Sequence, residues 1–279
     1  MKYGFVLPFG DAKVAAESAA LAEKSVWDGF FVWEPVWGMD AWVSLAAAAM
    51  VTEKIRLGTM LTPIARMRPW KLASETLTLD HLSKGRLILS IGLGATDIYQ
   101  GFPEETSRKL RAELTDEGLD ILTGLWKGAP FRYQGKHYQL DIPKKPVGPA
   151  YPPSPLQKPR IPIWMVGAWN KQKSMQRALR YDGLLPNIID SSGKVPMQPA
   201  TPQEIFEIRE FIRETQAAPA GYDIVVEGKT PGDDPIASAQ IVREYHEAGA
   251  TWWIEALWSS EQKGDFFDRI VQGPPKVKA

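Results

Sequence analysis

The sequence of 279 residues contains no cysteine, only three histidines and no excess charge, with 33 Lys and Arg against 33 Asp and Glu. The absence of cysteine excludes a disulfide scaffold, a cysteine nucleophile, an iron–sulfur cluster and a zinc ribbon. A net charge of zero argues against nucleic acid as a partner, because proteins that bind it usually carry a basic excess. No run of about 18 apolar residues is present to span a membrane. We therefore expect a cytoplasmic protein with no nucleic-acid or membrane partner.

Tryptophan, in contrast, is abundant, and the chain has 11 tryptophan residues. Rings of this size are either buried in a core or used as the walls of a site from which water is excluded. The position of each ring along its strand or helix decides between these two uses.

Short apolar segments alternate with longer amphipathic segments along the chain. The apolar segments are near-continuous, which is typical of parallel strands covered by helices. The segments between them carry apolar residues at helical spacing, as at Trp42, Leu45 and Ala49. The expected strands are Tyr3–Leu7, Gly29–Glu34, Ile55–Thr62, Arg86–Gly92, Ile161–Val166, Gly183–Asn187, Tyr222–Glu227 and Thr251–Leu257. Eight strands alternating with helices favour an α/β fold of the (β/α)8 TIM-barrel type, a single domain over residues 1–279, rather than a doubly wound open sheet.

One segment, at about residues 128–160, exceeds what a bare barrel needs. Residues 131–140 predict a β-hairpin, and eight prolines between Pro143 and Pro162 exclude a helix or a central strand after it. We expect this proline-rich insertion between the fourth helix and the fifth strand to be an ordered loop. It either forms a lid or wall that helps to set substrate specificity, or serves as a surface connection.

Several well-known catalytic motifs are absent. The Gly92-Leu93-Gly94 turn lacks the third glycine of a dinucleotide fingerprint, and neither a phosphate-binding Gly-x-x-x-x-Gly-Lys loop nor a Gly-x-Ser-x-Gly elbow occurs. The histidines are too scattered along the chain to be zinc ligands. We expect no metal site.

Catalytic residues of a TIM barrel lie at the carboxyl ends of its strands. Three glutamates fall at such ends, namely Glu34, Glu227 and Glu255. Because many glycosidases use two carboxylates across a barrel mouth, a TIM-barrel glycosidase with sugar-stacking tryptophans is one alternative. In the other alternative these glutamates pair with Arg66, Arg68 or Arg160 and have no chemical role.

Glycines at strand ends provide a second signal. Gly92, Gly94 and Gly167 would let a flat or bulky group approach the backbone closely, or would serve tight turns. A helix that starts near Lys171 offers free backbone N–H groups, and Lys171 and Lys173 would either help to hold a phosphate or be solvated.

The segment Leu79–Gly94 reads LDHLSKGRLILSIGLG. It resembles the bacterial luciferase-like family of flavin-dependent monooxygenases and oxidoreductases, whose members carry Leu-Asp-x-Leu-Ser-x-Gly-Arg before an apolar strand that ends in Gly-x-Gly. Further segments that resemble the family are Glu117–Trp126, Gly135–Tyr138, Pro159–Trp164 and Tyr181–Gly183. Together with the first strand, these segments extend the resemblance over nearly the whole chain.

The resemblance implies a barrel, usually a homodimer, that binds FMN or the deazaflavin coenzyme F-420 at the strand carboxyl ends. In FMN members a separate reductase supplies reduced flavin, which uses O₂ to oxygenate a small organic substrate. In deazaflavin members the same pocket transfers hydride. We therefore predict a two-component monooxygenase that uses reduced FMN. A coenzyme F-420-dependent oxidoreductase and a flavin carrier without turnover are the alternatives within this resemblance.

The resemblance also implies roles for individual residues. We expect cofactor contacts from the third strand, where a cis or strained peptide is common, and from three further strand ends: Met60, Leu61, Thr62, Gly92, Leu93, Gly94, Gly167, Ala168, Trp169, Asn170 and Asn187. We expect substrate contacts from Phe9, Trp33, Trp37, Glu227 and Trp258. Glu34 and Glu255 are predicted to be catalytic, with Glu34 handling a proton or orienting the substrate.

Three positions depart from the family pattern. Residues 33–35 are Trp-Glu-Pro where many members have a histidine, and Leu93 stands where some FMN members have an arginine. Residues 169–171 are Trp-Asn-Lys where many members have small residues. Because these positions affect the expected phosphate contacts, FMN and coenzyme F-420 both stay open as cofactors.

Overall fold

Parallel β-strands form a closed barrel. The computed structural model describes residues 1–145, 150–190, 198–258 and 263–276. Within them the strand order is β3-β2-β1-β11-β10-β9-β8-β5-β4, and a pairing of β3 with β5 closes the ring. The strands are β1 (Lys2–Leu7), β2 (Gly29–Val32), β3 (Arg56–Thr59) with its continuation β4 (Thr62–Pro63), β5 (Leu87–Gly92), β8 (Ile163–Ala168), β9 (Gly183–Asn187), β10 (Asp223–Gly228) and β11 (Trp252–Ala256). Counting β3 and β4 as one strand gives eight, so the predicted (β/α)8 barrel is confirmed.

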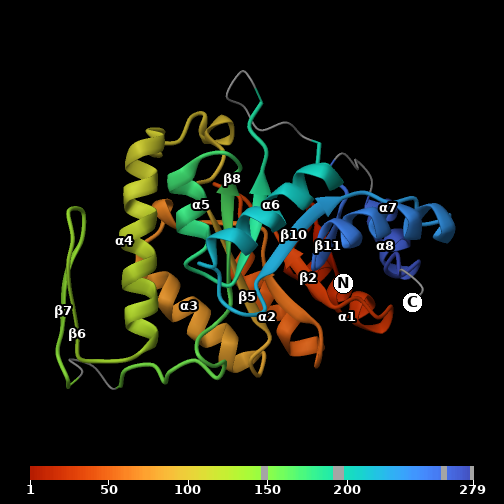
Figure 1. The fold of residues 1–279 in the computed structure, drawn as a ribbon. Helices are drawn as coiled ribbons and strands as arrows, with labels where there is room; N and C mark the ends of the chain where they lie inside the picture. The colour runs from red at the N-terminus through yellow and green to blue at the C-terminus, as the bar shows by residue number, and fades with distance from the viewer. Residues whose placement is uncertain (146–149, 191–197, 259–262, 277–279) are drawn as a thin grey trace.

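Helices cover the outside of this barrel (Figure 1). They begin where their sequences favour it, as at α6, where Thr201 and Glu204 form a reciprocal capping box. The helices are α1 (Ala12–Lys24), α2 (Ala41–Val51), α3 (Pro69–Leu82), α4 (Arg108–Trp126), α5 (Gln172–Ala178), α6 (Pro202–Thr215), α7 (Pro235–Ala248) and α8 (Lys263–Val271), with short 3-10 turns η1 (Ile64–Arg66) and η2 (Thr96–Tyr99). Among the described residues, no helix combines the length and the apolar character that crossing a membrane requires.

Aromatic rings fill the amino-terminal part of the barrel interior. Phe31, Trp164 and Trp252 are fully buried, and the ring centroid of Trp164 lies 5.4 Å from that of Phe31 and 5.1 Å from that of Trp252. Inward-facing glycines leave room for them, since a Cβ atom at Gly29 would lie 2.7 Å from the Phe31 ring and one at Gly183 2.5 Å from the Trp164 ring. These rings close the floor of the barrel, so a ligand must enter from the carboxyl ends of the strands.

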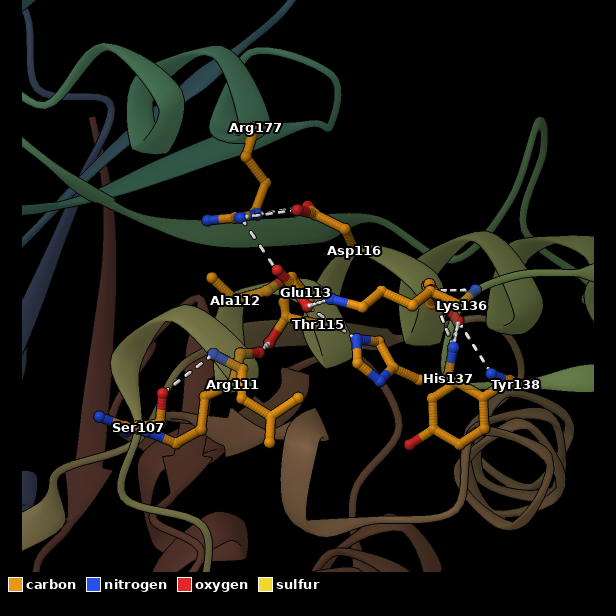
Figure 2. Close-up of polar contacts among 12 residues, drawn as sticks. Ser107, Arg111, Ala112, Glu113, Thr115, Asp116, Lys136, His137, Tyr138 and Arg177 are labelled. Atoms are coloured by element: carbon orange, nitrogen blue, oxygen red, sulfur yellow. Dashed lines mark hydrogen bonds and ion pairs between the residues drawn. The ribbon is translucent and has the colours of Figure 1, made fainter.

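The insertion between α4 and β8 begins with the predicted hairpin, formed by β6 (Phe131–Gln134) and β7 (Gln139–Ile142). The hairpin runs along the outer side of α4 (Figure 1), and two glutamates of that helix hold its loop (Figure 2). The Glu117 carboxylate accepts the backbone N–H groups of Lys136 at 2.8 Å, His137 at 3.0 Å and Tyr138 at 2.9 Å. The Glu113 carboxylate pairs with the side chains of Lys136 and His137, both at 2.8 Å. The hairpin is therefore fastened outside the barrel wall.

The proline-rich part of the insertion lies at the end of the barrel opposite the mouth. Gln157 donates from Nε2 to the Leu87 carbonyl at 2.7 Å and accepts from Nη1 of Arg56 at 2.9 Å. Asp80 on α3 accepts the Leu156 N–H at 2.7 Å. Leu87 and Arg56 begin β5 and β3, so this loop crosses the amino-terminal ends of the strands. Of the two expectations for this insertion, the described residues favour the surface connection over the lid or wall, because helix-to-strand connections of a TIM barrel lie at the face opposite the active site.

Candidate active site

Glu34 follows β2 directly and lies at the rim of the barrel mouth. Its side chain is largely buried, and its Oε2 atom has no hydrogen-bond partner among the described residues. Burial raises the pKa of this carboxyl group to about 7, although the Thr62 hydroxyl and the charge of Arg66 act in the opposite direction. A carboxyl group with a pKa near neutrality can both release and accept a proton under physiological conditions.

The backbone beside Glu34 offers a flat, apolar surface. The peptide bond between Met60 and Leu61 is cis, as the family resemblance implies for this strand. Gly92 lies on the strand paired with β4 and is covered by apolar side chains, since a Cβ atom there would lie 2.8 Å from Leu61 Cδ1 and 3.1 Å from Val166 Cγ2. The hydroxyl of Thr62 lies 2.9 Å from Thr59 Oγ1, so it is shared between that contact and the Glu34 carboxylate. The absence of a side chain at Gly92 lets Leu61 and Val166 pack together there and form an apolar wall.

The turn after Gly92 is held from behind by α4. Arg111 donates from Nη1 to the Leu93 carbonyl at 2.7 Å and to the Gly94 carbonyl at 2.8 Å. Gly94 has a φ of +78°, and a Cβ atom on it would lie 2.0 Å from the hydroxyl of Tyr99. Gly94 is therefore required by the turn and by Tyr99. Arg111 lies 17 residues after Gly94 in the sequence. The residue pattern around Arg111 indicates only a helix and does not reveal this contact.

The residues at the end of β8 that were predicted to hold a phosphate face in different directions. Gly167 faces α5, because a Cβ atom on it would lie 3.1 Å from Met175 Sδ. The Ala168 N–H donates to Ser174 Oγ at 2.9 Å, and the Trp169 N–H donates to the Asn187 carbonyl at 2.9 Å. Thus Ala168 and Asn187 lie side by side at the mouth, as their strand register also shows, whereas Gly167 serves helix packing.

Beyond this strand end lies a cleft of about 390 Å³. Trp169, Asn170 and Lys171 line one side, and Glu204 and Glu207 of α6 line another. Glu204 is occupied by the capping box of α6. Asp190 lines it as well, so the cleft brings one lysine and three carboxylates together, and its charge is less favourable to a phosphate than Lys171 alone suggests.

An aromatic cleft of about 210 Å³ opens between the loops that follow β1 and β2. Its walls include Phe9, Trp33 and Trp37, three of the residues predicted to contact substrate, together with Met39. Trp37 is 86% exposed and lies at the entrance. The polar group of Ser44 in this cleft is already bonded to the Asp40 carbonyl, so the walls favour an uncharged, apolar ligand.

Glu227 and Trp258 meet at the ends of β10 and β11, the two strands that follow β1 in the ring. Trp258 donates from Nε1 to Glu227 Oε2 at 3.1 Å. Burial raises the pKa of Glu227, and this hydrogen bond partly offsets the rise. The two residues therefore form a pair, and their contact with substrate stays a prediction.

Glu255, predicted to be catalytic, points away from the mouth. It is fully buried and accepts the Thr230 N–H at 2.7 Å, the Trp253 Nε1–H at 3.1 Å and Arg269 Nη2 at 3.2 Å. Its neighbours Trp253 and Arg269 pack between the barrel and α8, whereas Trp252 faces the interior. Glu255 is thus part of a buried ion pair, and the glycosidase alternative loses one of its three carboxylates.

Comparison with known proteins identifies the family. Residues 3–240 match the family described as luciferase-like monooxygenase, and the chain therefore belongs to that family. A Mycobacterium tuberculosis protein described as a candidate coenzyme F-420-dependent oxidoreductase is 34% identical over 195 residues, which are 67% of this chain and 55% of that protein. The F-420-dependent glucose-6-phosphate dehydrogenase of Kineococcus radiotolerans is 34% identical over 150 residues, which are 49% of this chain and 44% of that protein. The chain thus spans about half the length of these two curated relatives.

Solved structures support the same fold. An F-420-dependent secondary alcohol dehydrogenase matches with a TM-score of 0.74 at 18% identity, over 100% of this chain and 99% of that one. A long-chain alkane monooxygenase matches with a TM-score of 0.68 at 16% identity, over 97% of this chain and 89% of that one. The family predicted from the sequence motifs is confirmed by the family match, and these solved structures share its barrel fold.

Proposed function

We propose that the chain is an oxidoreductase that binds a flavin or deazaflavin at the barrel mouth and acts on a small, uncharged organic substrate. The observation that carries this proposal is the Glu34 carboxyl group at the carboxyl ends of the strands, whose buried Oε2 atom has no partner among the described residues, in a chain that matches the luciferase-like monooxygenase family over residues 3–240. The walls near it suit a planar heterocycle, since the Leu61 and Val166 side chains that pack on Gly92 are apolar. A flavin or deazaflavin, when bound, supplies the hydride or electron transfer.

The chain's own residues would bind and orient the cofactor and exclude water from it. Met60, Leu61 and Gly92 would hold the ring, and Ala168 and Asn187 would contact it from the other side of the mouth. Arg111 fixes the carbonyl groups of the Leu93–Gly94 turn behind it. These contacts would hold the ring in one orientation, which is the main contribution a protein makes to cofactor chemistry.

Substrate would enter the aromatic cleft. Phe9, Trp33 and Trp37 would hold an apolar molecule there and exclude water. Glu34, with a pKa of about 7, would transfer the proton that accompanies oxidation or reduction of a hydroxyl or carbonyl group. Glu227 and Trp258 would close another side of the site.

Coenzyme F-420 is the cofactor that the relatives favour. The two curated relatives described above carry F-420 in their names, as does the alcohol dehydrogenase structure. We therefore propose F-420-dependent hydride transfer first. The second candidate is the FMN and O₂ monooxygenase predicted from the sequence, which the description of the family supports and which would require a separate flavin reductase as partner.

Binding of the two cofactors separates these candidates. Purified protein is titrated with oxidised F-420 and, in parallel, with oxidised FMN, and dissociation constants are obtained from fluorescence. We expect the F-420 constant to be at least about tenfold lower, a difference of ~1.4 kcal/mol. Tighter FMN binding, with substrate-dependent O₂ consumption once a reductase is added, would favour the monooxygenase. Binding of neither cofactor would contradict both.

A further inference from the structure

The side chain of Arg66 connects the Glu34 rim to the loop between β5 and α4. Its guanidinium donates from Nη2 to the Pro35 carbonyl, next to Glu34, at 3.0 Å. Its Nε atom lies 3.6 Å from Glu104 Oε1 in that loop, which is an ion pair longer than a hydrogen bond. The Arg66 side chain is only 12% exposed. A nearly buried cation is thus placed between two carboxyl groups.

Several polar atoms in this group are buried without a hydrogen-bond partner among the described residues. They are Oε2 of Glu34 and both Nε and Nη1 of Arg66. Buried polar atoms are nearly always bonded in folded proteins, so this concentration is unusual. Since low polarity strengthens Coulomb interactions, the charge of Arg66 acts on Glu34 even without a direct contact.

The charged groups around Glu34 come from three parts of the chain. Arg66 on η1 is positive and favours the carboxylate form of Glu34, whereas Glu75 on α3 and Asp40 before α2 are negative and oppose it. Glu75 is paired with Lys71, and Asp40 caps α2 by accepting the Val43 N–H. Besides burial, these three charged groups and the Thr62 hydroxyl of β4 act on the protonation of Glu34.

The charged groups around Arg66 are fewer. Glu104 is its ion-pair partner, and the Tyr99 ring lies 5.6 Å from the guanidinium carbon. Arg111 lies on the same ring, 5.9 Å from its centroid, and repels Arg66. Glu104 therefore neutralises part of the positive charge that Glu34 would otherwise experience.

We propose that Arg66 is a positioning residue that sets the protonation state of Glu34, and that Glu104 tunes this effect through its ion pair with Arg66. The protonation of Glu34 is then coupled to the position of the loop of residues 95–107, which carries Glu104. The proposal rests on the proposed function in one respect only, namely that Glu34 exchanges its proton with the substrate. The coupling itself is a property of the protein without cofactor or substrate.

The charges determine the direction in which each substitution moves the titration midpoint of Glu34. Glu104→Gln leaves Arg66 uncompensated, so the Glu34 carboxylate is favoured and its titration midpoint falls by about one pH unit. Arg66→Gln removes the cation and raises the midpoint by about one pH unit or more. Arg66→Lys keeps the charge and changes the midpoint less than Arg66→Gln does. Glu105→Gln is the matched control, since it removes the same charge from the neighbouring position of the same loop.

The test is a titration of the cofactor-free protein, with the Glu side-chain carboxyl carbons labelled with ¹³C and observed by NMR. The Glu34 signal is identified by its loss in Glu34→Gln, and the melting temperature of each variant shows whether it is folded. A Glu104→Gln midpoint no lower than that of Glu105→Gln overturns the role of Glu104. An unchanged midpoint in folded Arg66→Gln, or a Lys variant that behaves like the Gln variant, overturns the role of Arg66.

The outcome is independent of cofactor binding. If the midpoints shift as expected while neither cofactor binds, the coupling stands and the proposed function fails. If a cofactor binds but the midpoints do not shift, the proposed function stands and the coupling fails. In an active enzyme, the pH profile of kcat should move in the same direction as the NMR midpoints, whereas KM changes little.

Discussion

A carboxyl group whose pKa is about 7 in the folded protein affects stability as well as chemistry. The ordinary value for glutamate is 4.5, so between these two pH values the unfolded chain releases the Glu34 proton while the folded chain retains it. The free energy of unfolding therefore falls as the pH rises from about 4.5 to 7. Two and a half pH units correspond to about 3 kcal/mol as an order of magnitude.

Glu34→Gln should remove this penalty, because a neutral amide replaces the carboxylate that burial disfavours. We expect the variant to be more stable than the wild type by up to about 3 kcal/mol at pH 8, with a difference near zero at pH 4. Urea unfolding at the two pH values measures it, with the exposed Glu214→Gln as control. The same variant should lose turnover while keeping cofactor affinity. Equal stability at both pH values would mean that Glu34 is not held in an apolar site.

Gly92 is the residue where an added side chain tests the cofactor site most directly. Gly92→Val would push on Leu61 and Val166 and so displace the apolar wall proposed for the ring, at a cost of roughly 1–3 kcal/mol, so the cofactor dissociation constant should rise about tenfold or more. Gly94→Val is less informative, because its φ of +78° and the contact with Tyr99 would distort the turn itself.

The control for Gly92→Val is Ala95→Val, which introduces the same valine side chain at an exposed position three residues further along the chain. Cofactor fluorescence gives both dissociation constants, and circular dichroism checks the fold. Equal affinities in the two variants would place the cofactor elsewhere.

At the scale of elements, the strands and the order of helices were predictable because near-continuous apolar segments and helical spacing are local signals. The direction of a side chain at a strand end was not. Glu227 pairs in register with Ile254 and faces the mouth, whereas Glu255 pairs with Gly228 and faces α8. A shift of one residue decides between these faces, and it depends on the register of the closed barrel. The same limit explains Gly167, while the contacts that Arg111 makes with the Leu93–Gly94 turn left no local signal in the sequence.

The ion pair of Glu255 belongs to the docking of α8. Glu255→Gln would leave Arg269 buried without its counter-charge, and removing one partner of a buried pair costs about 3–5 kcal/mol. We expect a loss of that order in the free energy of unfolding, measured with urea. Combining it with Arg269→Met should restore part of the loss, since the unpaired charge is then gone. A variant with full stability but no turnover would instead return Glu255 to a catalytic role.

At the scale of the whole molecule, α2 presents an uncharged outer surface to solvent. Residues 41–51 contain no charged side chain, and Val43, Met50 and Val51 are exposed. Exposed apolar surface of this kind is typical of interfaces, and a second copy with the same uncharged stripe can pair with it about a two-fold axis. This supports the homodimer that the family resemblance implies.

Met50→Glu should weaken such a dimer, because two carboxylates would be buried against each other across the axis. Met50 is 70% exposed in the monomer, so folding should be unaffected. Light scattering coupled to size-exclusion chromatography measures the mass of the wild type and the variant. Ile236→Glu, at an 82% exposed position on α7, is the matched control. A wild type that is monomeric at all concentrations would contradict this expectation.

The aromatic floor of the barrel bears on the order in which the proposed ligands would exchange. Phe31, Trp164 and Trp252 fill one end, so the proposed cofactor and substrate would enter and leave through the same open end. The ligand nearer the floor would then bind first and dissociate last. We therefore expect a compulsory order of binding, and inhibition of cofactor turnover by excess substrate if substrate is the outer ligand.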